Sequence, residues 1–119
     1  MTPVVGLDHV QIAAPEGCEP EARRFYGELL GLEEIEKPEP LKARGGAWFR
    51  CGEQQLHVGV ERPFKPALKA HPAFAVTDRD ELVATLERAG VTVTREAERV
   101  YAADPWGNRL ELVAATSGR

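Results

Sequence analysis

Cysteine and long apolar runs are scarce in this sequence, and each shortage excludes a class of protein. The two cysteines, Cys18 and Cys51, are too few for a disulfide framework and form no C-x-x-C motif, so reduced thiols are expected. No segment approaches the roughly 18 consecutive apolar residues that a membrane-spanning helix needs, and the N-terminus lacks a basic segment followed by an apolar run. We therefore expect a soluble, cytoplasmic protein with no membrane partner.

Basic residues are also fewer than acidic ones. The chain has 15 lysines and arginines against 19 aspartates and glutamates, which gives a formal net charge of -4. Nucleic-acid-binding proteins gain most of their affinity from clustered Lys and Arg, so nucleic acid is not an expected partner. What the chain does have is 119 residues with 43% hydrophobic content, enough for one domain with a substantial core.

The first half of the chain is predicted to form a strand, a helix and three further strands. In VGLDHVQIAA (5–14) apolar and polar residues alternate, which places His9 and Gln11 together on the polar face. In EARRFYGELLGL (21–32) apolar residues recur at helical spacing, and Gly31 is placed to end the helix. Pro-rich and Gly-rich stretches separate the three strands that follow, LEEIE, GAWFR and EQQLHVGVE.

The second half repeats this order. HPAFAV is a predicted strand, and TDRDELVATLERAG is a predicted helix with Asp78 or Asp80 as its N-cap and Gly90 at its end. Three strands follow, VTVT, ERVYAAD and NRLELVA, the last of them after the turn DPWGN. The predicted class is α+β: a single domain, 1–119, made of two βαβββ modules of about 4–61 and 70–115. The Pro-containing segment ERPFKPALKA connects the modules.

Aligning the two halves brings the residues that can bind metal into register. His9 corresponds to His71, and because QLHVGV corresponds to RLELVA, His57 corresponds to Glu111. If the modules pair about a pseudo-twofold axis, their inward-facing positions converge. Imidazoles and a carboxylate hold divalent ions such as Fe, Zn, Mn or Ni and leave coordination positions open. The repeat therefore predicts a metal site formed by His9, His57, His71 and Glu111.

Each of these residues also has an ordinary interpretation. A histidine in a strand is more often a surface or hydrogen-bonded residue than a ligand, and Glu111 would then balance Arg109. The matching positions of all four residues in the two halves favour the metal site.

The segments LDHVQIAA, RRFYGELLGL, QLHVGV, HPAFAV and especially DPWGNRLELV resemble the vicinal oxygen chelate superfamily. This superfamily includes glyoxalase I, fosfomycin-resistance proteins, extradiol dioxygenases and bleomycin-resistance proteins. The resemblance implies paired βαβββ modules with curled mixed sheets around a cleft, commonly in a homodimer. It also implies metal ligands at His9, His71 and Glu111 with a variable fourth position at His57. Glyoxalase I enzymes typically carry glutamate at that fourth position, so His57 is expected to be either a ligand or a base.

Two functions follow as alternatives. The first is a divalent-metal-dependent lyase, isomerase or dioxygenase whose small substrate is chelated through neighbouring oxygens, with His57 and Glu111 as catalytic residues. Gln11 and Arg109 are secondary candidates for this site. The second is a protein that sequesters a small hydrophobic or antibiotic-like ligand without chemistry, and a purely structural metal site is a third possibility. Candidates for ligand sequestration are aromatic: Trp48, Phe49, Phe74, Tyr101 and Trp106.

Overall fold

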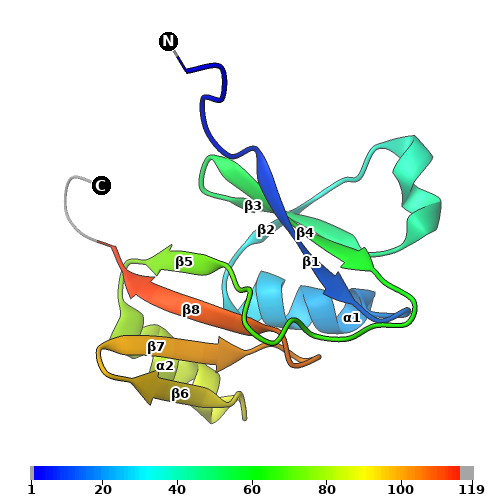
Figure 1. Cartoon of the computed structure of the whole chain (residues 1–119). Helices are drawn as coiled ribbons and strands as arrows, with labels where there is room; N and C mark the ends of the chain where they lie inside the picture. The colour runs from blue at the N-terminus through cyan, green and yellow to red at the C-terminus, as the bar shows by residue number, and fades with distance from the viewer. Residues whose placement is uncertain (1, 116–119) are drawn as a thin grey trace. The chain divides into compact units, whose positions relative to one another are not determined.

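A computed structural model describes residues 2–115, and the chain divides into two compact units, Met1–Phe64 and Lys65–Arg119 (Figure 1). Each unit contains one four-stranded sheet, with strand order β1-β4-β3-β2 in the first and β5-β8-β7-β6 in the second. In each sheet the first and last strands of the unit pair in parallel, and the other pairs are antiparallel. The predicted α+β class with two βαβββ modules is confirmed.

The first unit packs its helical segment on one face of its sheet. Phe25 and Tyr26 are buried on this segment, and the Tyr26 ring centroid lies 6.1 Å from that of Phe49 on the sheet. The predicted helix is confirmed, although most of it is π-helical, and Gly31 follows it with a φ of 78° that favours glycine. In chain order the elements are β1 (His9–Ala14), α1 (Glu19–Ala22), the π-helix η1 (Arg23–Leu29), β2 (Glu33–Ile35), the 3-10 helix η2 (Glu39–Arg44), β3 (Ala47–Cys51) and β4 (Gln54–Val60).

The second unit follows the same plan with a regular α-helix. The Asp78 carboxylate accepts a hydrogen bond from the Glu81 backbone N–H at 3.1 Å, so Asp78 rather than Asp80 is the N-cap. Val83 and Leu86 are buried on the inner face of this helix. In chain order the elements are β5 (Ala73–Val76), α2 (Arg79–Arg88), β6 (Val93–Glu96), β7 (Arg99–Ala103) and β8 (Arg109–Ala114).

The turn that precedes β8 is built around one carboxylate. Asp104 accepts hydrogen bonds from the backbone N–H of Trp106 (3.0 Å), the backbone N–H of Asn108 (2.8 Å) and the Asn108 side-chain amide (2.9 Å). Gly107 has a φ of 93°, which glycine adopts without strain. Because these bonds lock the turn, they set the register in which β8 pairs with its neighbours and the face on which Glu111 lies.

No helix within residues 2–115 is long and apolar enough to cross a membrane.

Candidate functional site

Strand register gives His57 and Glu111 equivalent places in the two units. His57 lies on β4 opposite Gln11 of β1, its parallel neighbour, and opposite Trp48 of β3, its antiparallel neighbour. Glu111 lies on β8 between Ala73 of β5 and Tyr101 of β7 in the same way. His9 precedes Gln11 by two residues, as His71 precedes Ala73. The correspondence expected from the sequence is therefore confirmed: His57 matches Glu111, and His9 matches His71.

In the second unit, His71 and Glu111 are in direct contact. The His71 Nε2 lies 3.2 Å from Glu111 Oε1, and its Nδ1 donates to the Lys69 carbonyl at 2.8 Å. Both neighbours of the ring are acceptors: a carbonyl can only accept, and so can an ionised carboxylate. A neutral imidazole that donates from Nδ1 therefore directs its Nε2 lone pair at the carboxylate oxygen. These two electron-rich atoms repel each other unless a proton or a metal cation lies between them.

The distance between these two atoms also suits a shared cation. Two ligand atoms that each lie about 2.1 Å from one ion, at angles between 90° and tetrahedral, are about 3.0–3.4 Å apart. The observed 3.2 Å between His71 Nε2 and Glu111 Oε1 falls in this range. The Lys69 carbonyl on Nδ1 is the kind of outer partner that fixes the tautomer of a metal-binding histidine. Chemically and geometrically, the residues present fit a divalent ion.

Glu111 is kept ionised although it is 7% exposed. Burial alone raises the pKa of this carboxyl group, but the hydrogen bond from His71 and the charge of Arg99 outweigh burial, and the pKa is lowered overall. The Arg99 guanidinium donates to Glu111 Oε2 at 3.0 Å. The two carboxylate oxygens thus face different partners, the histidine on one side and the arginine on the other.

Arg109 does not pair with Glu111, contrary to the ordinary interpretation of the sequence. Its guanidinium lies 3.6 Å from the centroid of the Tyr101 ring and 3.4 Å from a Glu96 oxygen. The partner that sequence reasoning missed is Arg99. Arg99 and Tyr101 lie on the same face of β7, and Tyr101 lies opposite Glu111 on β8. The sequence therefore contained a signal for the pair of Arg99 and Glu111, but using it requires the register of the β7–β8 hairpin.

In the first unit, three rings stack across three adjacent strands. The His57 ring lies 4.1 Å from that of His9 at an interplanar angle of 18°, and 3.7 Å from Trp48 at 3°. His57 is only 4% exposed, and its Nε2 lies 2.9 Å from the Gln55 side-chain oxygen. Burial, followed by the nearby charge of His9, lowers the pKa of His57. His57 is therefore a neutral imidazole near neutral pH, the form that binds metal or accepts a proton.

His9 is the more accessible member of the stack. Its Nδ1 lies 2.9 Å from the Asp8 carboxylate, and 43% of its side chain is exposed. As at His71, an acceptor engages Nδ1 and Nε2 is left as the potential ligand. Stacked rings direct their lone pairs along nearly parallel planes, so one ring must turn before both bind a single ion. His9 is the ring with room to turn.

The residues predicted to bind metal therefore occur as two pairs, His9 with His57 and His71 with Glu111. Across residues 2–115, no group of three or more His, Cys, Asp or Glu side chains is arranged to hold a metal ion. The four-residue site remains a prediction.

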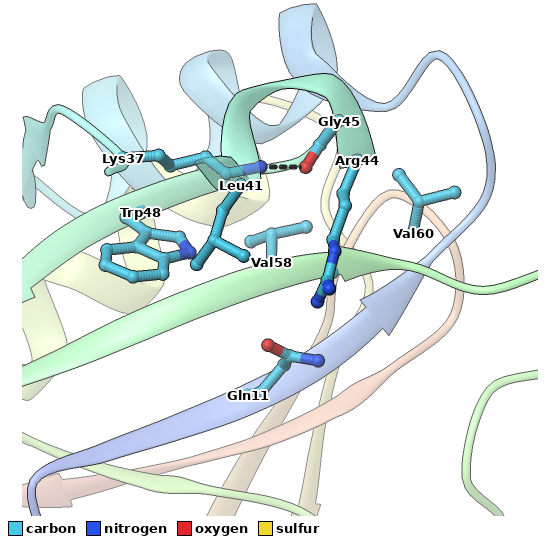
Figure 2. Close-up of a pocket in the computed structure, with 9 residues that line it drawn as sticks. Gln11, Lys37, Leu41, Arg44, Gly45, Trp48, Val58 and Val60 are labelled. Atoms are coloured by element: carbon cyan, nitrogen blue, oxygen red, sulfur yellow. Dashed lines mark hydrogen bonds between the residues drawn. The ribbon is translucent and has the colours of Figure 1, made fainter. Parts of the chain in front are cut away.

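The aromatic residues considered for ligand sequestration mostly have structural roles. Phe49 is fully buried, and Phe74 and Tyr101 are less than a tenth exposed, so these three belong to the core. Trp48 differs, because it stacks on His57 and also lines a pocket of about 190 Å³ (Figure 2). Gln11, a secondary candidate from the sequence, lines the same pocket.

Comparison with known proteins agrees with this architecture. The family model of the Glyoxalase/Bleomycin resistance protein/Dioxygenase superfamily matches residues 6–112. A glyoxalase family protein from Bacillus anthracis is 52% identical in sequence, with a TM-score of 0.89, over 94% of this chain and 96% of that chain. No curated protein sequence matches the chain significantly.

Two further solved structures share the fold at low sequence identity. Lactoylglutathione lyase from Agrobacterium tumefaciens is 22% identical, with a TM-score of 0.71, over 93% of this chain and 94% of that chain. The fosfomycin resistance protein FosX from Listeria monocytogenes is 18% identical, with a TM-score of 0.77, over 96% of this chain and 94% of that chain.

Proposed function

Because the chain belongs to the Glyoxalase/Bleomycin resistance protein/Dioxygenase superfamily, the vicinal oxygen chelate superfamily that its motifs resemble, we propose that it is a divalent-metal-dependent enzyme. Its substrate is a small molecule that binds through two neighbouring oxygens, and the reaction is of the lyase, isomerase or dioxygenase type. His9, His71 and Glu111 are metal ligands, and His57 is a fourth ligand or a base. The ion is Zn, Ni, Fe or Mn, the metals that this ligand set accepts.

One observation carries the proposal. His71 lies between the Lys69 carbonyl and the Glu111 carboxylate, two acceptors that one neutral imidazole cannot both satisfy. A proton or a metal cation at Nε2 removes the conflict, and the metal cation does so with the ring in the neutral tautomer that Lys69 selects. His9 supports the same interpretation, because the Asp8 carboxylate engages its Nδ1 in a similar way.

When bound, the divalent ion supplies Lewis-acid stabilisation of negative charge on the substrate oxygens. The chain's own residues prepare for this chemistry. The charge and hydrogen bond of Arg99 favour the ionised form of Glu111, which makes the carboxylate a ligand rather than a neutral acid. The flanking rings of His9 and Trp48 keep His57 buried and neutral, so its free nitrogen is available to bind the ion or to take a proton from the substrate.

The test is elemental analysis of the full chain, purified without an affinity tag and exchanged into metal-free buffer. We expect near-stoichiometric divalent metal in the wild type and its loss in Glu111→Ala and His9→Ala. Glu98→Ala removes an exposed carboxylate between β6 and β7 and is the matched control, which keeps its metal. Full metal content in His9→Ala, or no metal in the wild type after reconstitution with each of the four ions, would overturn the proposal.

The alternative function is sequestration of a small hydrophobic or antibiotic-like ligand. The observation in its favour is the pocket beside Trp48, whose indole ring provides a flat apolar wall. Tight ligand binding that persists after treatment with a chelator, together with absence of metal in the elemental analysis, would select this alternative.

We also propose that the protein forms a homodimer and is located in the cytoplasm. Both cysteines are free thiols, Cys18 buried and Cys51 partly buried, in keeping with a reducing compartment. Sedimentation analysis tests the oligomeric state, and a single species at the mass of one chain would contradict the dimer.

A further inference from the structure

We propose that the pocket beside Trp48 binds an organic oxyanion, a carboxylate or a phosphate ester, and that this anion is one group of the substrate. This inference rests on the proposed function only in identifying the anion as part of a substrate. Binding of the anion does not itself require the metal. The pocket lies wholly within the first unit, beside the middle of β1 and the C-terminal end of β4 and under η2. The residues that line it are Gln11, Lys37, Leu41, Arg44, Gly45, Trp48, Val58, Gly59 and Val60 (Figure 2).

The lining of the pocket is positively charged. Two of the nine lining residues, Lys37 and Arg44, are basic and none is acidic, in a chain whose net charge is -4. Arg44 makes no hydrogen bond or ion pair within the described residues. Lys42, on the same short helix, pairs with the carboxylates of Glu36 and Glu39 instead. Local carboxylates thus neutralise one cation of η2 and leave the cation that faces the pocket unpaired.

The polar side chains of the lining extend into the pocket. Figure 2 shows the Arg44 guanidinium extending from η2 across the pocket towards the side-chain amide of Gln11. The Lys37 ammonium donates to the Gly45 carbonyl at the pocket rim, which uses one of its three N–H groups. A guanidinium fork matches the two oxygens of a carboxylate or phosphate, and a neighbouring ammonium adds a second positive charge.

The backbone leaves room for this arrangement. A Cβ atom on Gly59 would lie 2.6 Å from Nε2 of Gln11, so only glycine at this position of β4 lets the Gln11 amide lie across the strand. Gln11 is also the cross-strand partner of His57, and Trp48 stacks on the same His57 ring. An anion held here therefore lies beside a residue of the proposed metal site.

The rest of the lining suits an apolar group attached to the anion. Leu41 and Val58 lie beside the indole of Trp48 as an apolar part of the lining, and Val60 lies on the other side of Arg44 (Figure 2). The volume of about 190 Å³ is below the roughly 300–1,000 Å³ of sites that enclose a whole drug-sized ligand. The pocket therefore accommodates one charged end of a substrate and its adjoining carbons.

The test is calorimetric titration of the full chain after treatment with EDTA, with benzoate, phenyl phosphate and benzamide as probes. Benzamide has the shape of benzoate without its charge. We expect saturable binding of at least one anion and at least tenfold weaker binding of benzamide, a loss of about 1.4 kcal/mol. The anion that binds more tightly distinguishes a carboxylate from a phosphate substrate.

Arg44→Ala is expected to weaken binding of the preferred anion at least tenfold, and Arg44→Lys, which keeps the charge without the fork, to weaken it less. Arg24→Ala removes an exposed arginine on η1 outside the pocket and is the matched control, with unchanged affinity. Equal binding by Arg44→Ala and Arg24→Ala, equal binding of benzamide and benzoate, or no saturable binding of either anion would overturn the proposal.

The anion titration and the metal analysis can fail independently of each other. If anion binding depends on Arg44 and elemental analysis finds no metal in the untreated chain, the pocket is supported and ligand sequestration is favoured over the enzyme. Anion binding that requires metal and ignores Arg44 overturns the pocket while the proposed enzyme stands.

Discussion

His57 and Glu111 occupy the same position of the last strand in two repeated units, yet their surroundings have opposite character. His57 is enclosed by two rings, His9 and Trp48, which favour its neutral form. Glu111 lies between the His71 ring and the Arg99 guanidinium, and the charge of Arg99 favours its ionised form. The repeat has thus kept the position and changed the chemistry, and both resulting forms are those that bind a divalent ion.

Trp48 is expected to control the protonation of His57. In protein treated with EDTA, the pKa of His57 should lie below its ordinary value of 6.5, because burial disfavours the imidazolium. Trp48→Ala opens one face of the ring, so the pKa should rise towards 6.5. Proton NMR titration of the three histidines measures this, with Trp106→Ala as the control. An unchanged titration of His57 in Trp48→Ala would show that the stack does not set its pKa.

Glu19 is expected to make stability depend on pH in the acid range. Its carboxylate accepts a hydrogen bond from the Gly46 backbone N–H at 2.7 Å, and this bond is the main cause of its lowered pKa. Because the folded-state pKa lies below the ordinary 4.5, the unfolded chain binds the proton first. The contribution to the free energy of unfolding is therefore complete above pH 4.5 and is lost as the pH falls through the folded-state value.

Glu19→Gln should show a shallower loss of stability below pH 4.5 than the wild type, measured by urea unfolding at a series of pH values. The amide oxygen still accepts from Gly46, so the comparison isolates the charge. Glu98→Gln, at an exposed carboxylate, corrects for the change in net charge. Parallel pH profiles for Glu19→Gln and the wild type would contradict the assignment.

Gly46 is expected to tolerate no side chain. Its φ is 89°, and a Cβ atom there would lie 2.1 Å from the Val58 carbonyl oxygen. Gly52 also has a positive φ, 60°, but a Cβ atom there meets nothing within 4 Å. Gly52→Ala should therefore cost only the backbone strain of about 1 kcal/mol, and Gly46→Ala at least about 3 kcal/mol. Thermal denaturation compares the two, and equal losses would mean that the Val58 contact is easily relieved.

Asp104 is expected to link the turn before β8 to the proposed metal site. Asp104→Ala removes the acceptor of three hydrogen bonds and should lower the free energy of unfolding by about 2–3 kcal/mol. Since the turn sets the register of β8, the variant should also bind metal less tightly while it is still folded. Metal titration monitored by calorimetry, below the melting temperature of the variant, measures the second effect. Unaltered metal affinity would separate the turn from the site.

The sequence was sufficient for the features that depend on local spacing. Alternation along β1 and β8, the N-cap at Asp78 and Gly31 after the first helix each follow from rules that act over a few residues. The repeat added a long-range relationship that these local rules do not give, because aligning the two halves placed His57 and Glu111 in matching positions before any strand register was known.

Features that depend on cross-strand neighbours were not predictable. The stack of His57 on Trp48 and the pair of Arg99 with Glu111 both require the register of a hairpin, which single-strand patterns leave open. The short helix η2 lies in a Pro-rich stretch that was expected only to separate two strands, and it supplies Arg44 to the pocket. Its two prolines precede or begin the helix, where proline is tolerated.

The most direct test of the metal site is X-ray absorption spectroscopy at the metal edge of the reconstituted full chain, compared among the wild type, His9→Ala and His71→Ala. We expect imidazole scattering around the ion in the wild type and a loss of part of it in each variant, because each unit is proposed to contribute a histidine ligand. A spectrum that loses imidazole in one variant and not in the other, or that contains none in the wild type, would contradict the claim that both repeats bind the ion.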